Sequence, residues 1–284
     1  MSFSSDIKEE ISMVNNYKNK KLLEAELLGY ILTGNSIASD NYIEFVTENE
    51  FNIERFYKIL FNLNIDYDPE IKGKVFVAKM NKDAALDEVL KVQFEDDEEI
   101  KKAIVKGAFL GAGTVIDPNK QYHLEIVFLD KSNALYISNL CAMFGVSIKL
   151  LEDKKYILYI KDGEEISKFL ALIGATKGVL SFEDVRVTRE IKNNVNRKVN
   201  CETANLNKVV NASVNQINDI NFIKKMKKFD ELPEYLKEIA RVRLEFPDMP
   251  LKDLGQQLDK PLGKSGVNHR LQKIHEIAEE LKRG

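Results

Sequence analysis

One segment of this chain occurs twice, and the repeat limits the folds that the first two-thirds can adopt. Residues 28–37 align with residues 106–115 at an offset of 78, with glycine on glycine and aliphatic on aliphatic. A small insertion changes the offset to 81, and the two following strand-like segments then align as well. Self-similarity at a fixed period marks a duplicated structural unit. We therefore predict two copies of one unit, in residues 1–95 and 96–190.

Each copy has the same predicted order of elements. Helical periodicity covers residues 21–32 and 99–110, each helix ends in a turn of small residues, and a strand follows each turn. An amphipathic helix comes next, with apolar side chains at i, i+3, i+4 and i+7. These are Phe56, Ile59, Leu60 and Leu63 in the first copy and Ile137, Leu140, Cys141 and Phe144 in the second. Further strands and short helices follow at residues 75–80 and 84–90, and at residues 156–161 and 165–172. The order in each copy is αββαββα.

A helix ending in small residues at the start of each αββαββα unit resembles the LAGLIDADG homing-endonuclease fold. That family packs its two motif helices against each other, and small residues let the two backbones approach closely. The residues that carry the resemblance are Gly29, Gly34, Gly107, Gly111 and Gly113. The resemblance implies an α+β first domain in which the two copies meet along these helices.

In the LAGLIDADG family, an acid near the end of each motif helix binds the metal that activates water for strand cleavage. The matching positions here are Gly34 and Ala112, which carry no ligand atom. Asp40 and Asp117 follow a few residues later, beside Asn41 and Pro118, where a turn role is expected. The three histidines include no i, i+4 pair, and the two cysteines lie 60 positions apart. We predict no metal site, no cofactor and no nuclease activity.

The charge of the chain is divided unevenly between its two parts. Residues 1–185 hold 22 Lys and Arg against 31 Asp and Glu, a net charge of −9, whereas residues 186–284 hold 20 against 14, or +6. An acidic first part indicates that only the second part approaches a polyanion, and that another protein or a small molecule is the better partner for the first. Chance clustering of surface charge is the alternative. The chain lacks a long apolar run and a signal-like start, which predicts a cytoplasmic protein without membrane contact.

Helical periodicity resumes near Asn200, and its apolar positions predict a buried face. Those positions are Leu206, Val209, Val210, Val214, Ile217 and Ile220. Asparagines at positions 207, 211, 215 and 218 occupy the opposite face, as solvated amides or as contacts to sugar and phosphate. Basic residues flank this helix on both sides. We expect phosphate contacts from Arg189, Arg197, Lys198, Lys224 and Lys225, with a merely solvated charged face as the alternative.

The end of the chain has helix-turn-helix form over about residues 250–282, within an all-α domain at 191–284. A short helix at residues 250–258 and a connector at residues 259–264 precede a long helix, which Ser265 is expected to cap. The connector exceeds the usual turn of about three or four residues. The predicted DNA-binding residues are Lys264, Ser265, Asn268, His269, Arg270, Gln272 and Lys273. The lysines suit phosphates, and one or more of Asn268, His269, Arg270 and Gln272 suit base edges. A plain three-helix bundle is the alternative.

Two C-terminal motifs, combined with the degenerate LAGLIDADG pair, closely resemble the bacterial WhiA family over nearly the whole chain. The motifs are Asn200-Cys201-Glu202-Thr203-Ala204-Asn205-Leu206 and Gly263-Lys264-Ser265-Gly266-Val267-Asn268-His269-Arg270-Leu271. The resemblance implies a DNA-binding protein linked to cell division and chromosome segregation. In spore-forming lineages it also implies transcription regulation during sporulation.

The sequence therefore predicts a nucleoid-associated protein that reads double-stranded DNA and regulates transcription without an enzymatic reaction. Two other functions remain open. Residual carboxylates such as Asp40 and Asp117 would suit a site-specific endonuclease, and the basic segments would suit an RNA-associated scaffold.

Overall fold

The computed structural model describes residues 2–92 and 96–283, and the chain divides into two compact units at residues 1–190 and 191–284. The first unit mixes helices and strands and the second is helical. Helix α8 begins in the first unit and ends in the second. No helix among the described residues has an apolar stretch long enough to cross a lipid bilayer.

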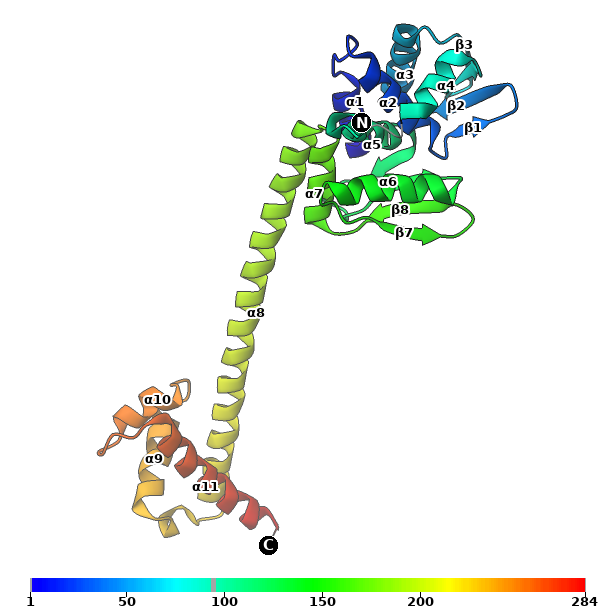
Figure 1. Ribbon diagram of the computed structural model, residues 1–284. Coiled ribbons are helices and arrows are strands. Elements are labelled where there is room, and N and C mark those ends of the chain that lie inside the picture. Colours follow the sequence, from blue (N-terminus) through cyan, green and yellow to red (C-terminus); the bar gives the residue numbers. More distant parts are fainter. Residues whose placement is uncertain (1, 93–95, 284) are drawn as a thin grey trace. The chain divides into compact units, whose positions relative to one another are not determined.

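The first unit contains the two predicted αββαββα copies (Figure 1). The first copy consists of α2 (Lys20–Ile31), β1 (Ser36–Ala38), β2 (Tyr42–Thr47), α3 (Glu50–Leu63), β3 (Tyr67–Lys72), β4 (Val75–Asn81) and α4 (Ala84–Lys91). The second consists of α5 (Glu98–Ala112), β5 (Gly113–Val115), β6 (Leu124–Phe128), α6 (Lys131–Met143), β7 (Lys149–Glu152), β8 (Tyr156–Ile160) and α7 (Gly163–Leu172). The two antiparallel sheets have equivalent strand orders, β1-β2-β4-β3 and β5-β6-β8-β7. The α+β fold predicted from the repeat is confirmed.

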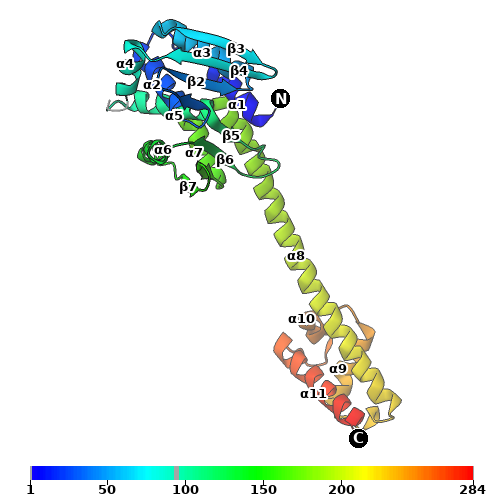
Figure 2. The ribbon, with the colours of Figure 1, turned by 90° about the vertical axis from the view of Figure 1, so that its right-hand side faces the viewer.

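Helices α2 and α5 lie side by side at the junction of the two copies (Figures 1 and 2). A Cβ atom on Gly29 would lie 2.1 Å from the carbonyl oxygen of Ile104, and one on Gly107 would lie 1.9 Å from that of Glu26. Both distances are far below van der Waals contact, so any side chain at either position would separate the backbones. The close helix approach predicted from these glycines is confirmed.

A buried ion cluster joins the two copies beside this junction. Arg55 of α3 donates from Nε and Nη2 to the two carboxylate oxygens of Glu26 in α2, both at 2.8 Å. Lys106 of α5 donates to the same carboxylate at 3.1 Å. Burial alone would raise the pKa of Glu26, but Lys106 and Arg55 together hold it below its ordinary value. The carboxylate is therefore charged and shared between the copies.

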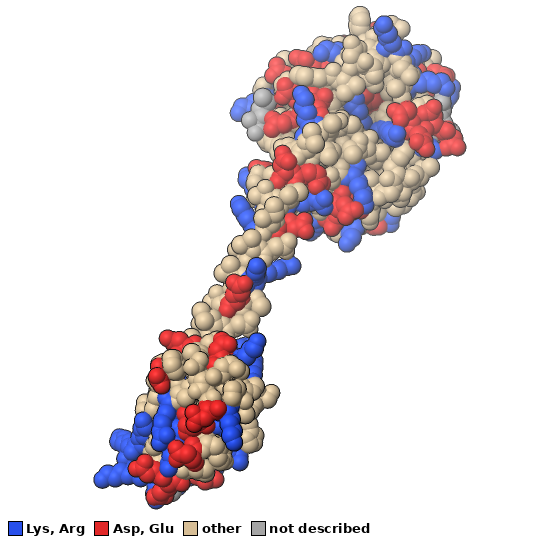
Figure 3. Space-filling view, turned by 90° about the vertical axis from the view of Figure 1, so that its left-hand side faces the viewer, with Lys and Arg blue, Asp and Glu red and all other residues tan. Residues whose placement is uncertain are grey.

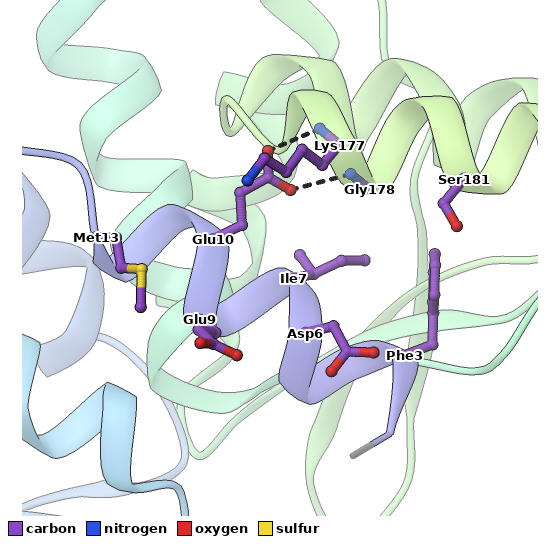
Figure 4. A pocket seen from close by; sticks show the side chains of 9 residues that line it. All are labelled: Phe3, Asp6, Ile7, Glu9, Glu10, Met13, Lys177, Gly178 and Ser181. Atoms are coloured by element: carbon purple, nitrogen blue, oxygen red, sulfur yellow. Dashed lines mark hydrogen bonds between the residues drawn. The ribbon is translucent and has the colours of Figure 1, made fainter.

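Helix α1 (Phe3–Ser12), which the sequence pattern did not predict, packs on the first unit and holds the start of α8 (Thr176–Lys225). The Glu10 carboxylate accepts hydrogen bonds from the backbone N–H groups of Lys177 and Gly178, at 2.7 and 2.9 Å (Figure 4). These are free donors of the first turn of α8, where a negative charge also suits the helix dipole. A cavity of about 430 Å³ lies between α1 and this turn.

The structure corrects the prediction for the segment around Asn200. A helix does not start there, because α8 runs without interruption from Thr176 to Lys225. The apolar residues expected to form a core are mostly exposed, with Leu206 63% exposed and Val214 48% exposed. Ile220 and Ile223, six and nine residues after Val214, are fully buried. Periodicity identified an apolar face but could not show that most of it lacks a partner within the described chain.

The second unit packs α9 (Glu234–Glu245), α10 (Leu251–Leu254) and α11 (Lys264–Arg283) against the end of α8. Short 3₁₀ turns lie at Phe229–Glu231 and Gly255–Gln257. The core is formed by Ile220, Ile223, Leu232, Leu236, Ile239, Ala240, Leu254, Leu258, Val267, Leu271, Ile274 and Ala278. Arg243 is also buried, and its guanidinium donates to the carbonyls of Pro247 and Met249 at 3.1 and 2.8 Å. These bonds fix the chain between α9 and α10.

Candidate nucleic-acid interface

Helices α10 and α11 and the turn between them form the helix-turn-helix segment. The turn folds back so closely that Leu262 N–H donates to the Gly255 carbonyl at 3.0 Å. A Cβ atom on Gly255 would lie only 2.1 Å from the Leu262 carbonyl oxygen. Sequence reasoning did not single out Gly255, although a lone glycine near the end of a short helix is a signal for such an approach.

Helix α11 presents two different faces. Val267, Leu271, Ile274 and Ala278 are buried in the core, as the 3.6-residue period predicted. The opposite face is exposed and carries Ser265, Asn268, His269, Gln272 and Lys273. Lys264, Ser265, Asn268, His269 and Gln272 line an open depression of about 500 Å³. Within the described chain, these polar side chains have no hydrogen-bond or ion-pair partner, so they are available to a ligand.

The start of α11 differs from the prediction by two residues. Ser265 was expected to cap the helix, but the helix already includes Lys264, and the first helical hydrogen bond runs from Val267 N–H to the Gly263 carbonyl. Ser265 therefore lies inside the first turn. Its hydroxyl and the Lys264 ammonium both sit at the positive end of the helix, where phosphates bind.

Arg270 is engaged within the domain. Its Nη1 donates to Glu238 Oε2 at 3.2 Å and to the Tyr235 carbonyl at 3.3 Å, and its guanidinium lies 5.5 Å from the Tyr235 ring centre. The other oxygen of Glu238 accepts from the backbone N–H of Asp259 at 2.7 Å. Glu238 thus holds both the turn and α11 against α9. Sequence reasoning missed this residue, because a glutamate on an amphipathic helix is usually a solvated one.

The five candidate phosphate-binding residues all lie on α8, but their surroundings differ. Arg189 is half-buried, donates to the carbonyls of Asn119 and Lys120 at 2.6 and 3.2 Å, and stacks on Tyr122. Lys224 lies 5.0 Å from the Phe229 ring centre but is exposed. Arg197, Lys198 and Lys225 are also exposed. Arg189 therefore anchors α8 to the second copy, and the other four are open to solvent.

The ends of the motif helices in the first unit lack the chemistry of a metal site. Gly34 offers no side chain, and Ala112 is buried. The last turn of α5 is instead satisfied by neutral and cationic donors: Asn52 and Lys8 donate to the Leu110 carbonyl, and Asn35 to that of Gly111. Burial lowers the pKa of Lys8 to about 8, so its ammonium remains mostly protonated at neutral pH. A nuclease metal does not fit this arrangement.

Of the two aspartates that follow the motif helices, Asp117 stabilises a turn, and Asp40 is exposed. Asp117 accepts hydrogen bonds from the backbone and side-chain nitrogens of Asn119, at 2.8 and 3.1 Å, and these bonds lower its pKa. This is an Asx turn, as expected for Asp before Pro118. Asp40 is exposed in the turn between β1 and β2.

One group of three candidate metal ligands occurs in the described part of the chain, and it lies in the second unit. Asp219, His275 and Glu279 bring their ligand atoms within 4.8 Å of one another. Lys282 already donates to Asp219 and Glu279, at 3.2 and 2.8 Å. The lysine ammonium thus neutralises these carboxylates and ties the end of α11 to α8.

Surface charge also separates the two units. Residues 1–190 hold 24 basic against 32 acidic residues, and residues 191–284 hold 18 against 13. On the face shown in Figure 3, acidic and basic side chains are interspersed on both units, so the units differ in the balance of charge and not in a single-sign patch. Because neutralising phosphates requires a surplus of Lys and Arg, the second unit is the better surface for a nucleic acid.

Comparison with known proteins identifies similar sequences for both units. A model described as the WhiA LAGLIDADG-like domain matches residues 101–192, and one described as the WhiA C-terminal HTH domain matches residues 195–278. The curated relatives named "Probable cell division protein WhiA" include that of Clostridium acetobutylicum, 38% identical over 316 residues that cover 100% of this chain and 99% of the relative. The relative from Clostridium perfringens is 43% identical over 251 residues, covering 88% and 75%.

Solved structures give the same result. The crystal structure of full-length DUF199/WhiA from "Thermatoga maritima" matches with a TM-score of 0.64 at 26% identity, covering 99% of both chains. The structure of the N-terminal LAGLIDADG domain of DUF199/WhiA matches with a TM-score of 0.54 at 22% identity, over 61% of this chain and 92% of that one. The second match supports the fold of the first unit alone.

Proposed function

The chain belongs to the WhiA family, and from this premise we propose that it reads DNA sequence as a transcriptional regulator in cell division and chromosome segregation. The observation that carries the proposal is the outer face of α11, where polar side chains without partners gather at a helix start. Hydrogen-bonding side chains in the first turns of such a helix can reach base edges in the major groove. A protein bound in this way would be located on the nucleoid.

We assign different roles to neighbouring residues of this face. Lys264 at the helix start and Lys273 at its edge contact phosphates. Ser265, Asn268, His269 and Gln272, which border the depression, contact base edges. Arg270 is a positioning residue that acts through Glu238. Arg197, Lys198, Lys224 and Lys225 add phosphate contacts along α8.

Salt-dependent binding separates these roles. Lys273→Ala is expected to weaken binding to all duplexes about equally and to lower the salt slope by roughly one unit. His269→Ala or Gln272→Ala should cost on the order of 1–3 kcal/mol on the preferred duplex and much less on random DNA. The measurement is fluorescence anisotropy on a duplex obtained by in vitro selection, over a salt series.

Two controls accompany this experiment. Glu238→Ala should copy the effect of Arg270→Ala, because both remove the same ion pair, whereas a base-reading Arg270 would lose specificity alone. If Lys273→Ala, His269→Ala and Gln272→Ala all bind like the parent, with unchanged circular dichroism, α11 is not the interface. Tighter binding to structured RNA at equal salt would favour the RNA-scaffold alternative.

We further propose that the first unit is a scaffold without nuclease activity, and that its acidic surface receives a protein partner. Gly34 and Ala112 provide no metal ligand, and the ammonium of Lys8 lies at the last turn of α5. A divalent cation there would meet the positive charge of this ammonium.

A plasmid assay tests the absence of nuclease activity. Supercoiled plasmid should remain uncut with stoichiometric protein in magnesium or manganese. Linear product that is absent from a mock purification, and that is lost in Asp40→Asn or Asp117→Asn, would instead establish the endonuclease alternative.

A further inference from the structure

The middle of α8 carries an apolar stripe that is exposed along its length. Ile191, Val195, Val199 and Leu206 follow one another at spacings of four and seven residues, so they lie on one side of the helix. Each is between 52% and 63% exposed. The same side continues to Ile220, which is fully buried in the core of the second unit. The apolar face that α8 buries in the core of the second unit therefore continues along the exposed part of the helix.

The opposite side of α8 shows that this segment is more than a spacer. It carries asparagines at positions 193, 196, 200, 207 and 211, all exposed. A helix that only bridges two domains would be polar all round, whereas this one is two-faced. Asparagine and β-branched valine are also poor helix formers, which makes the isolated segment weakly stable. Burial of the stripe would supply the missing stability.

The charged residues beside the stripe indicate which partner it binds, and in which direction. Lys192 and Glu202 both lie on this side of α8, are exposed, and have no ion-pair partner within the described chain. In a parallel, in-register pair of α8 helices, each would face its own like charge. In an antiparallel pair centred on residue 197, Lys192 faces Glu202 and Val195 faces Val199. The opposite charges then meet at both ends of an aliphatic centre.

We propose that the stripe is the docking surface for α8 of a second copy of this chain, in this antiparallel register. The four aliphatic side chains and the stems of their neighbours would bury on the order of 1,000 Å² in total, near the lower limit for a specific interface. A dimer with a dissociation constant in the micromolar range is therefore expected. In this register Lys198 lies opposite Asn196, and the two Lys198 side chains are near each other only at the exposed rim, where solvent screens the repulsion.

Charge reversal tests the register with the full chain. Sedimentation velocity from about 1 to 100 µM should show a monomer–dimer equilibrium. Lys192→Glu or Glu202→Lys alone should raise the dissociation constant at least tenfold, and the double reversal should restore it. Lys208→Glu makes the same charge change away from the stripe and should leave the equilibrium unchanged.

Cysteine crosslinking tests the direction of the helices. In a Cys201→Ser background, Val195→Cys with Val199→Cys should form a disulfide-linked dimer on mild oxidation, whereas Val195→Cys alone should not. Crosslinking by the single variant would show a parallel pair and overturn the proposal. A chain that stays monomeric to 100 µM, with circular dichroism showing intact helices, would also overturn it, as would a double reversal that fails to restore the dimer.

Discussion

Glu26→Ala is expected to lower the free energy of unfolding of the first unit by about 3–5 kcal/mol. The substitution leaves the guanidinium of Arg55 and the ammonium of Lys106 in the interior without their shared counter-charge. Hydrogen exchange detected by mass spectrometry measures this change in the free energy of unfolding, because it follows α2, α3 and α5 separately from the second unit. Glu54→Ala, which removes an exposed glutamate paired with Lys58, is the matched control and should cost less than about 1 kcal/mol. Equal effects of the two substitutions would show that the cluster stabilises nothing.

The same cluster predicts a pH dependence with a defined sign. The pKa of Glu26 is lowered in the folded state, so its contribution is fully present above the unfolded value of about 4.3. The contribution is lost as the pH falls through the folded pKa. Acid unfolding of the first unit should therefore steepen below about pH 4, and Glu26→Gln should flatten that part of the curve.

Gly255→Ala is expected to destabilise the second unit by on the order of 1–3 kcal/mol and to weaken DNA binding at least tenfold. The added methyl group would overlap the Leu262 carbonyl, so the turn must move away from α10 and carry the start of α11 with it. Thermal denaturation and anisotropy measure the two effects.

Gly266→Ala is the control for this substitution. A Cβ atom on Gly266 would lie 3.5 Å from its nearest neighbour, and alanine is the better helix former. Gly266→Ala is expected to raise the free energy of unfolding of the second unit by about 0.5–1 kcal/mol. If both glycines tolerate alanine, the close approach at Gly255 does not position α11.

Local signals predicted most of the first unit. The repeat predicted the two αββαββα copies, and the glycines at positions 29 and 107 predicted the close packing of α2 and α5. The structure confirms both predictions. Helix α1 escaped prediction because its apolar side chains are few and its partner, the start of α8, is more than 160 residues away. The Glu26 cluster escaped because a charged side chain is normally on the surface, and only tertiary packing buries it.

The candidate interface was predicted in part for the same reason. Periodicity fixes which side of α11 faces the core, and so it identified the exposed side that includes His269 and Gln272. It could not show that Arg270 turns toward Glu238, because that contact joins residues 32 positions apart. It also could not distinguish a buried face from an uncovered one in α8, since both have the same spacing of apolar residues.

The hydrogen bonds from Lys177 and Gly178 to Glu10 set an order of events during synthesis of the chain on the ribosome. Ile7 and Ile11 of α1 are fully buried in the native first unit, but part of their cover is made last. At about 5–20 residues per second, on the order of 10–30 s pass between emergence of α1 and synthesis of its partner. During this interval the apolar side chains of α1 lack the part of their cover that the start of α8 supplies.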